Sequence, residues 1–231
     1  PLPKRYTATI RLGVETDTAD RTGAVVAETD GVEDLGRFEV EDALQKQVGT
    51  IFQRPPQYSA KKIDGVAAHR RMRRGEDVEL SASEVTIHSI EVTRFDLPEV
   101  DIEVSCSTGT YIRSIARDLG RELVVGGHLT ALRRTAIGPY DVEGALEWEA
   151  LEDPGRAQAG LTPTADALEQ LCRFEVPEED AVLLRAGRAI AVPPGVEPAA
   201  LMLATAQGKV VSVGEPLDGR FVPRKVFPDG A

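Results

Sequence analysis

One stretch decides the fold: Cys106-Ser107-Thr108-Gly109-Thr110-Tyr111-Ile112-Arg113-Ser114-Ile115-Ala116-Arg117-Asp118-Leu119-Gly120. Before it, apolar and polar residues alternate from Ile102 to Cys106, which predicts a strand with one buried face. After it, apolar residues recur at helical spacing as far as Leu123. The sequence therefore predicts a strand, a turn over residues 107–110, in which Gly109 is free of the Cβ penalty, and a helix.

Arg113 falls in the first turn of this predicted helix, off the apolar stripe. A cation is disfavoured there by the helix dipole. We therefore expect an acidic partner from elsewhere in the chain. The alternative is an exposed arginine without a special role, since exposed charges usually contribute little.

The 231 residues leave room for one large domain, or for a medium domain and a small one. Hydrophobic residues make up 42% and charged residues 28%, as in ordinary globular proteins. No stretch resembles a membrane span or a secretory signal. Cys106 and Cys172 give neither a disulfide framework nor metal-ligand spacing, and with three histidines a zinc site is not expected. We expect a reducing, cytoplasmic setting and no metal.

The net charge of −11 is unevenly distributed. Twelve acids lie between Asp141 and Ala181, whereas residues 54–75 carry seven basic side chains against one acid. Net charge describes solubility, but its distribution describes a binding face. Residues 54–75 could therefore bind phosphate, or simply form a solvated face.

The chain before this basic stretch predicts two strands and a helix. A strand over residues 4–12 ends at Gly13, a polar loop over residues 16–23 follows, and a second strand covers residues 24–28. Apolar spacing then predicts one helix from Phe38 to Ile51. A second helix, predicted from Val66 to Arg74, has few apolar residues and therefore projects; with Tyr58 nearby, such an element suits an RNA backbone.

The chain beyond residue 83 predicts more strands than helices. Residues 84–95 and 101–107 are expected to be neighbouring strands, residues 126–139 a glycine loop and strand, and residues 143–151 a short helix. Residues 152–163 are polar, as in a linker. Helices over residues 163–172 and 177–186 and strands over residues 199–204, 210–214 and 221–227 then predict a small β-rich domain. The fold class is α+β.

Five motifs in the same order resemble the TruB family of tRNA pseudouridine synthases. Together they are far more specific than any one of them, and they are Lys4-Arg5-Tyr6 with Leu12-Gly13, Thr16-Asp17-Thr18-Ala19-Asp20 with Gly23, Pro56-Gln57-Tyr58-Ser59-Ala60-Lys61-Lys62, Gly109-Thr110-Tyr111-Ile112-Arg113, and Gly127-His128-Leu129 with Leu132-Arg133-Arg134.

The resemblance implies a mixed, mainly antiparallel sheet with flanking helices, followed by a small PUA-like RNA-binding domain. We expect an N-terminally incomplete catalytic domain over residues 1–153 with a thumb at 55–84, a linker at 154–162 and the PUA-like domain at 163–231. The implied reaction converts uridine 55 in the T loop of tRNA to pseudouridine by base flipping, without a cofactor. The implied partner is the tRNA T arm, and we expect a monomer.

The resemblance also implies roles for single residues. Tyr6 would stack on the flipped uracil and assist proton removal, Arg113 would pair with the catalytic aspartate, and Asp20 would be the second acid. Tyr111 and Leu132 would line the uridine pocket, although by composition Leu132 could simply be core. The basic and aromatic residues expected to contact RNA are Tyr58, Lys61, Lys62, Arg70, Arg71, Arg73, Arg74, Arg133 and Arg134.

The family's nucleophile lies in a Gly-x-Leu-Asp-Pro motif upstream of the Tyr6 strand, and these 231 residues do not contain that motif. The position of Asp20 matches the second acid and not the nucleophile. We expect this chain alone to be inactive and the protein from which it comes to be a synthase.

Two other classes of function stay open. A non-catalytic tRNA-binding or tRNA-folding module would need the basic thumb and the pocket but no nucleophile. A hydrolase with Cys106 as nucleophile is the remaining enzyme reading, although Cys106 falls on the apolar side of its strand and no histidine is evidently related to it.

Overall fold

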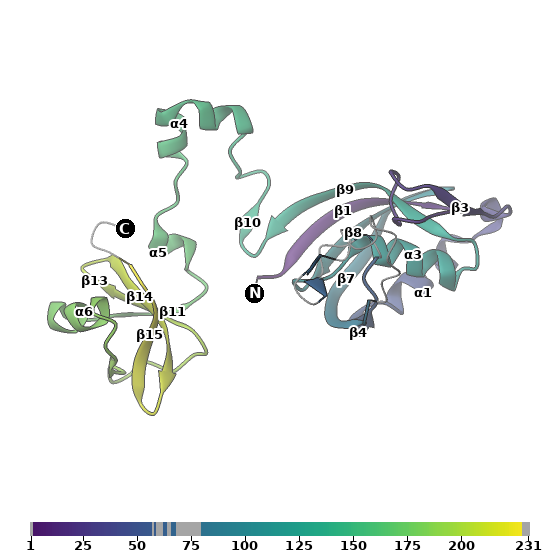
Figure 1. Ribbon diagram of the computed structural model, residues 1–231. Coiled ribbons are helices and arrows are strands. Elements are labelled where there is room, and N and C mark those ends of the chain that lie inside the picture. The colour runs from purple at the N-terminus through teal and green to yellow at the C-terminus, as the bar shows by residue number, and fades with distance from the viewer. Residues whose placement is uncertain (1, 57, 59–61, 64–65, 68–79, 228–231) are drawn as a thin grey trace. The chain divides into compact units, whose positions relative to one another are not determined.

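The computed structural model describes residues 2–56, 58, 62–63, 66–67 and 80–227. The chain divides into two compact units, Pro1–Ala145 and Leu146–Ala231. Figure 1 shows a large sheet with helices against it in the first unit and a smaller sheet in the second. Strands outnumber long helices, and all but one of the strand pairs described are antiparallel. The predicted α+β class with a mainly antiparallel sheet is confirmed.

The first unit is built on a six-stranded sheet in the order β10-β9-β1-β8-β7-β4. Its middle strand β1 pairs along its length with β8 on one side and β9 on the other, so that Tyr6 lies between Val104 and Arg134. The strands are β1 (Lys4–Leu12), β4 (Gly49–Gln53), β7 (Ser83–Asp96), β8 (Glu99–Cys106), β9 (Gly127–Ile137) and β10 (Tyr140–Asp141).

Helices α1 (Arg37–Gln45) and α3 (Ile112–Glu122) lie against one face of this sheet (Figure 1). Alternate residues of β1 and β8 are buried there, including Ile10 and Ile102, and Leu44 and Ile115 pack on them from the helices. Burying such side chains contributes about 1.5–3 kcal/mol each. The core therefore fixes α3, and with it Arg113, relative to the sheet.

Gly120 lets α3 approach the start of β9 closely. A Cβ at this position would lie 2.1 Å from the carbonyl carbon of Gly126 and 2.3 Å from the amide nitrogen of Gly127. Both of those atoms belong to the backbone and cannot move aside. The glycine is thus required by helix-to-strand packing.

The loop around Asp20 joins the strands of a small hairpin, β2 (Val14–Thr16) and β3 (Val25–Glu28), as predicted. A 3-10 turn, η1 (Val32–Asp34), then leads to α1.

Two predicted helices are wrong in part. The helix predicted from Phe38 to Ile51 is α1 followed by β4, because Gly49 has φ +108° and the β-prone residues after it pair with β7. The predicted helix at Val66 begins instead as a strand, β6 (Val66–Ala67), which pairs with β5 (Lys62–Ile63). The rest of that prediction, residues 68–74, lies outside the described residues.

The second unit contains a five-stranded sheet in the order β11-β13-β14-β15-β12. Helix α6 (Glu178–Arg185) packs on it through Ala181 and Leu184, and the ring of Phe174 meets that of Phe221 edge-on at 5.1 Å. The predicted β-rich character is confirmed. The strands are β11 (Cys172–Glu175), β12 (Ile190–Ala191), β13 (Met202–Ala206), β14 (Lys209–Leu217) and β15 (Arg220–Val226).

The chain around the division between the units differs from prediction. The helix predicted over residues 143–151 is only a 3-10 turn, η2 (Trp148–Glu152). Helix α4 (Pro154–Ala159) occupies part of the predicted linker, because Asp153 accepts hydrogen bonds from the amides of Gly155 and Arg156. The helix predicted over residues 163–172 is shorter, as α5 (Thr164–Ala167).

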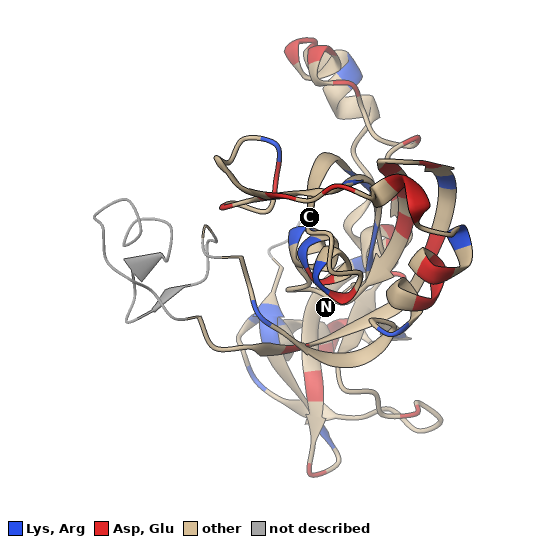
Figure 2. Ribbon diagram, turned by 90° about the vertical axis from the view of Figure 1, so that its right-hand side faces the viewer, with Lys and Arg blue, Asp and Glu red and all other residues tan. Residues whose placement is uncertain are grey.

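Acidic and basic residues are both spread over the ribbon (Figure 2). Basic residues project from strand β9, where Arg133 and Arg134 are exposed. Most of the basic stretch over residues 54–75 lies outside the described residues. No helix in the described part of the chain is long and apolar enough to cross a membrane.

Candidate active site

The loop between β2 and β3 is built by its own side chains. The Thr16 hydroxyl donates to the backbone carbonyl of Asp20 at 2.8 Å, and the Asp17 carboxylate accepts from the backbone amide of Ala24 at 2.9 Å. Short polar side chains that bond nearby backbone groups are typical of tight loops. Because the loop also joins β9 through the Leu129 amide, which donates to the Ala19 carbonyl at 3.1 Å, the position of Asp20 is fixed.

The Asp20 carboxylate accepts hydrogen bonds from both sides of the loop. Its Oδ1 accepts from the Thr18 hydroxyl at 2.9 Å, the Thr22 hydroxyl at 2.6 Å and the Thr22 amide at 2.9 Å. Partial burial on its own would raise the pKa of Asp20, but the bonds from Thr22 and Thr18 and the charge of Arg113 outweigh it and lower the pKa below its ordinary value. Asp20 is therefore held as a carboxylate.

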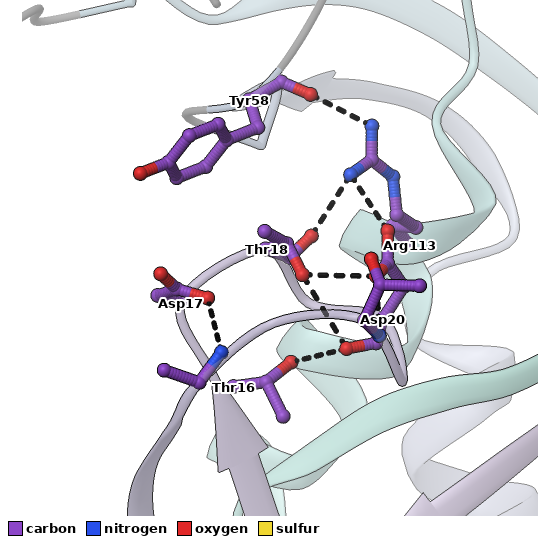
Figure 3. A network of polar contacts seen from close by, with 8 residues as sticks. Thr16, Asp17, Thr18, Asp20, Tyr58 and Arg113 are labelled. Carbon is purple, nitrogen blue, oxygen red and sulfur yellow. Dashed lines mark hydrogen bonds and ion pairs between the residues drawn. The ribbon is translucent and has the colours of Figure 1, made fainter. Parts of the chain in front are cut away.

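Arg113 joins this loop to a second segment (Figure 3). Its Nη1 donates to the Thr18 carbonyl at 3.0 Å and to Oδ2 of Asp20 at 3.1 Å, and its Nη2 donates to the Tyr58 carbonyl at 2.9 Å. The Arg113 side chain is 23% exposed and that of Asp20 is 28% exposed. The acidic partner expected for Arg113 is therefore present, and it is Asp20.

Asp20 and Arg113 line a cavity of about 420 Å³ together with Leu132. Leu132 lies on β9 and is 51% exposed, so it is not the core residue that composition alone favours. The cavity thus combines an ion pair with an exposed aliphatic side chain. Its other lining residues are Arg21, Thr22, Leu129, Thr130 and Ala131.

Tyr6 lines a second cavity of about 350 Å³, which also contacts Arg5, Ser105 and Thr135. Burial raises the pKa of Tyr6, and the neighbouring charge of Arg134 offsets only part of that rise. The phenol is therefore protonated at neutral pH. The described contacts bring Asp20, Arg113 and Leu132 around one cavity, whereas they place Tyr6 beside Arg134.

The remaining predicted residues are placed as follows. Tyr111 is the N-cap of α3, half-buried, and the Tyr58 carbonyl meets Arg113. Lys62 is part of β5. The predicted RNA-contacting residues Lys61, Arg70, Arg71, Arg73 and Arg74 lie outside the described residues.

Sequence reasoning missed three residues that shape this site. Thr18 and Thr22 each hold the Asp20 carboxylate, and their position two residues before and after an aspartate is a signal for side-chain turns. Gln53, at the end of β4, bonds both backbone polar groups of Tyr111. The sequence marks Gln53 only as an amide side chain two residues before the Pro55-Pro56 pair.

Cys106 is unsuited to the hydrolase alternative. It is fully buried, and burial raises the pKa of its thiol above the ordinary value. A nucleophilic cysteine needs the opposite shift and access to substrate. His128 forms a hydrogen bond through Nδ1 to the Val14 carbonyl oxygen, at 2.8 Å.

Two family models match the chain. The N-terminal domain of TruB family pseudouridylate synthase matches residues 2–112, and the C-terminal domain of tRNA pseudouridylate synthase B matches residues 113–182.

Relatives named tRNA pseudouridine synthase B agree with these matches. The protein from Corynebacterium diphtheriae is 49% identical over 161 residues, which cover 65% of this chain and 52% of the relative. The protein from Aromatoleum aromaticum is 44% identical over 214 residues, which cover 92% of this chain and 68% of the relative. The chain thus spans between about half and two thirds of these relatives' length.

Solved structures share the fold. A Cbf5-Nop10-Gar1 complex matches with a TM-score of 0.70 at 21% identity, covering 99% of this chain and 66% of the other. A structure of an H/ACA RNP bound to a substrate RNA containing 2'-deoxyuridine matches with a TM-score of 0.68 at 19% identity, covering 99% and 67%. The two family models and the 44% identity over 92% of the chain establish that the chain belongs to the TruB family of pseudouridylate synthases.

Proposed function

We propose that these residues form the uridine-binding part of a tRNA pseudouridine synthase that acts on uridine 55 of the T loop in the cytoplasm. The observation that carries the proposal is the Arg113–Asp20 ion pair beside Leu132 at the 420 Å³ cavity, in a chain of the TruB family. The nucleophilic aspartate of the reaction would come from a Gly-x-Leu-Asp-Pro segment outside these 231 residues.

The isomerisation requires a carboxylate at the sugar and a cation beside that carboxylate. The bond from the ribose C1' to uracil N1 breaks, the base turns over, C1' bonds to C5, and the proton on C5 leaves while N1 gains one. A carboxylate must attack or stabilise C1', and a cation must keep that carboxylate ionised. In the proposed site Arg113 supplies this cation, and Asp20 and the Thr18 carbonyl hold it in place.

The base needs a platform once it has left its stack. An aromatic ring contributes about 1–3 kcal/mol of stacking per base. We propose Tyr6 for this role, with Tyr111 and Leu132 lining the pocket. Because the phenol of Tyr6 is protonated, it would relay the C5 proton by accepting it while its own hydroxyl proton passes to N1 or to solvent. The proposed reaction needs no cofactor.

A direct test uses two proteins. The 231-residue chain and a longer gene product that contains a Gly-x-Leu-Asp-Pro segment are each incubated with unmodified tRNA, and pseudouridine at position 55 is mapped by carbodiimide treatment and primer extension. We expect pseudouridine only with the longer product. Conversion at any rate by the chain alone would contradict the assignment of the nucleophile.

RNA binding tests the rest of the proposal and the alternative of a non-catalytic module. The chain should bind a T-arm hairpin more tightly than an acceptor-stem hairpin of equal length. Replacing Arg70, Arg71, Arg73 and Arg74 with Gln should flatten the slope of log K against log salt, and an unaltered slope removes them from the interface. If the longer product binds the T arm but forms no pseudouridine, the module alternative replaces the enzyme.

Residues 163–231, which form most of the second unit, are proposed to be the PUA-like RNA-binding domain. Their five-stranded sheet supports the proposal. We propose that the whole protein is a monomer. Its mass measured by light scattering at several protein concentrations tests this.

A further inference from the structure

We infer that Gln53 is a positioning residue for the reaction, because its side-chain amide fixes the first turn of α3 and so the direction of Arg113. This inference rests on the proposed function. Gln53 ends β4, an edge strand of the sheet, and Arg113 belongs to a helix packed on that sheet. The two are linked through the backbone of Tyr111.

The N-cap of α3 has no side-chain cap of its own. Tyr111 occupies the N-cap position with φ −101° and ψ 110°, and its side chain makes no capping bond. Gln53 bonds the same residue twice: Oε1 accepts from the Tyr111 amide at 2.8 Å, and Nε2 donates to the Tyr111 carbonyl at 3.1 Å. Since Gln53 is only 3% exposed, water cannot replace these bonds easily.

The residue after Gln53 is tied to the same helix. The Arg54 carbonyl accepts from the Ser114 hydroxyl at 2.9 Å and from Nη2 of Arg117 at 3.0 Å. Arg117 is held in turn by the Asp118 carboxylate at 2.8 and 3.1 Å. Four hydrogen bonds thus join residues 53–54 to the start of α3, from its N-cap Tyr111 to Arg117.

Tyr58, a few residues after Gln53, contributes a hydrogen-bond acceptor to the Arg113 guanidinium. The Tyr58 carbonyl accepts from Nη2 at 2.9 Å, while Nη1 faces Thr18 and Asp20. A shift of α3 relative to residues 53–54 would therefore move Arg113 away from both sets of partners. Displacements on the order of 1 Å at a reacting group can cost about a hundredfold in rate.

The side-chain amide of Gln53 provides both the donor and the acceptor that this arrangement uses. Gln53→Glu keeps the acceptor for the Tyr111 amide but turns the donor into a second acceptor that faces the Tyr111 carbonyl. Gln53→Met keeps the length of the side chain and loses both bonds. Gln53→Met thus removes the two bonds, and Gln53→Glu in addition sets a buried carboxylate oxygen against a carbonyl oxygen.

Gln47 provides a matched control. Its Nε2 donates to the Ile115 carbonyl of the same helix at 3.3 Å, and its Oε1 has no hydrogen-bond partner among the residues that the structure describes. Gln47→Met thus also removes an amide bond to α3, but at Ile115 and not at the N-cap residue Tyr111.

The test compares Gln53→Met, Gln53→Glu and Gln47→Met with the wild type. In the 231-residue chain, the Nε–Hε resonance of Arg113 is followed by NMR, assigned by its loss in Arg113→Lys, together with the thermal midpoint. In the longer gene product, kcat and KM are measured with tRNA. We expect Gln53→Met to shift or broaden the Arg113 resonance and to lower kcat by about tenfold to a hundredfold with KM within about twofold. Gln53→Glu should lower kcat at least as much, because a buried carboxylate oxygen without a donor would face the Tyr111 carbonyl.

Gln47→Met should lower the thermal midpoint while the Arg113 resonance and kcat stay near the wild-type values. The inference is overturned if Gln53→Met lowers the midpoint but leaves the resonance and kcat unchanged, as a purely structural glutamine would. If the wild type of the longer product forms no pseudouridine, the proposed function fails, but the Arg113 resonance still decides whether Gln53 positions the arginine.

Discussion

Arg113 and Asp20 lie 3.1 Å apart across two segments that are more than ninety residues apart in the chain, and each has further partners that hold it in place. Thr18 and Thr22 bond the carboxylate from within the loop, and the Thr18 and Tyr58 carbonyls bond the guanidinium. The pair is neither fully buried nor freely exposed. Its contribution to stability should thus lie between those of surface and buried pairs.

Asp20→Asn isolates the charge of this pair, because the amide oxygen can still accept from Thr18 and Thr22. We expect it to lower the free energy of unfolding by about 1–2 kcal/mol, since Arg113 keeps its carbonyl partners but loses its counter-charge. Urea denaturation at pH 7 measures the change. Asp17→Asn is the matched control: the Asp17 carboxylate accepts from the Ala24 amide in the same loop, and its loss of charge should cost less than about 0.5 kcal/mol. Equal losses in both variants would mean that the loop, and not the ion pair, matters.

The same pair predicts how stability depends on pH. The pKa of Asp20 is lower in the folded protein than its ordinary value of 3.8, because the hydrogen bonds of Thr22 and Thr18 and the charge of Arg113 outweigh the effect of burial. A depressed carboxyl pKa stabilises the fold above the unfolded value and is lost as the pH falls through the folded value. The difference in unfolding free energy between the wild type and Asp20→Asn should therefore be constant from pH 7 to about pH 5 and shrink below about pH 4. A difference that is the same at pH 7 and pH 3 would contradict the assigned pKa shift.

Much of this site could be predicted from the sequence, because the patterns that indicate it lie within short stretches of the chain. The period-two pattern before Cys106 and the helical spacing after Tyr111 predicted the strand, the turn and the helix, and the place of Arg113 in the first turn predicted an acidic partner. What failed was non-local. The helical spacing of Val48 and Ile51 could not reveal that α1 ends at Gln45 and that β4 pairs with β7.

Gln53 escaped prediction for the same reason. The sequence does not indicate which group a side-chain amide at the end of a strand will bond. The packing of α3 on the sheet brings the Tyr111 backbone to Gln53. Leu132 illustrates the converse, because composition favoured a core position and the structure leaves half of its side chain exposed beside the Arg113–Asp20 pair.

Gly23 should be essential to the Asp20 loop. A Cβ there would lie 2.3 Å from the Thr18 hydroxyl oxygen, 2.4 Å from Oδ1 of Asp17 and 2.9 Å from the Thr18 amide nitrogen. Gly23→Ala should therefore displace Thr18, weaken its bond to Asp20 and cost about 1–3 kcal/mol in unfolding free energy. Gly144→Ala is the control, because a Cβ at Gly144 would lie 3.5 Å from its nearest described neighbour, Oδ1 of Asp141, which is ordinary van der Waals contact. Circular-dichroism melts of the two variants measure the contrast, and similar midpoints for both would argue against a close-packed loop.

Tyr6 allows stacking to be separated from chemistry. If its ring is the platform for the flipped base, Tyr6→Phe should keep the affinity of the longer gene product for tRNA, whereas Tyr6→Leu should lose about 1–3 kcal/mol of binding. If the hydroxyl also relays the C5 proton, Tyr6→Phe should lower kcat without raising KM, because proton transfer by a positioned group contributes about a hundredfold or more. Fluorescence anisotropy with a T-arm hairpin measures the affinity, and pseudouridine formation over time measures kcat.

Tyr6 lies beside Arg134, so Arg134→Gln is the useful comparison: it removes the neighbouring charge that lowers the phenol pKa and leaves the ring in place. Unchanged turnover in Tyr6→Phe would restrict Tyr6 to stacking, and unchanged affinity in Tyr6→Leu would remove it from the uridine pocket.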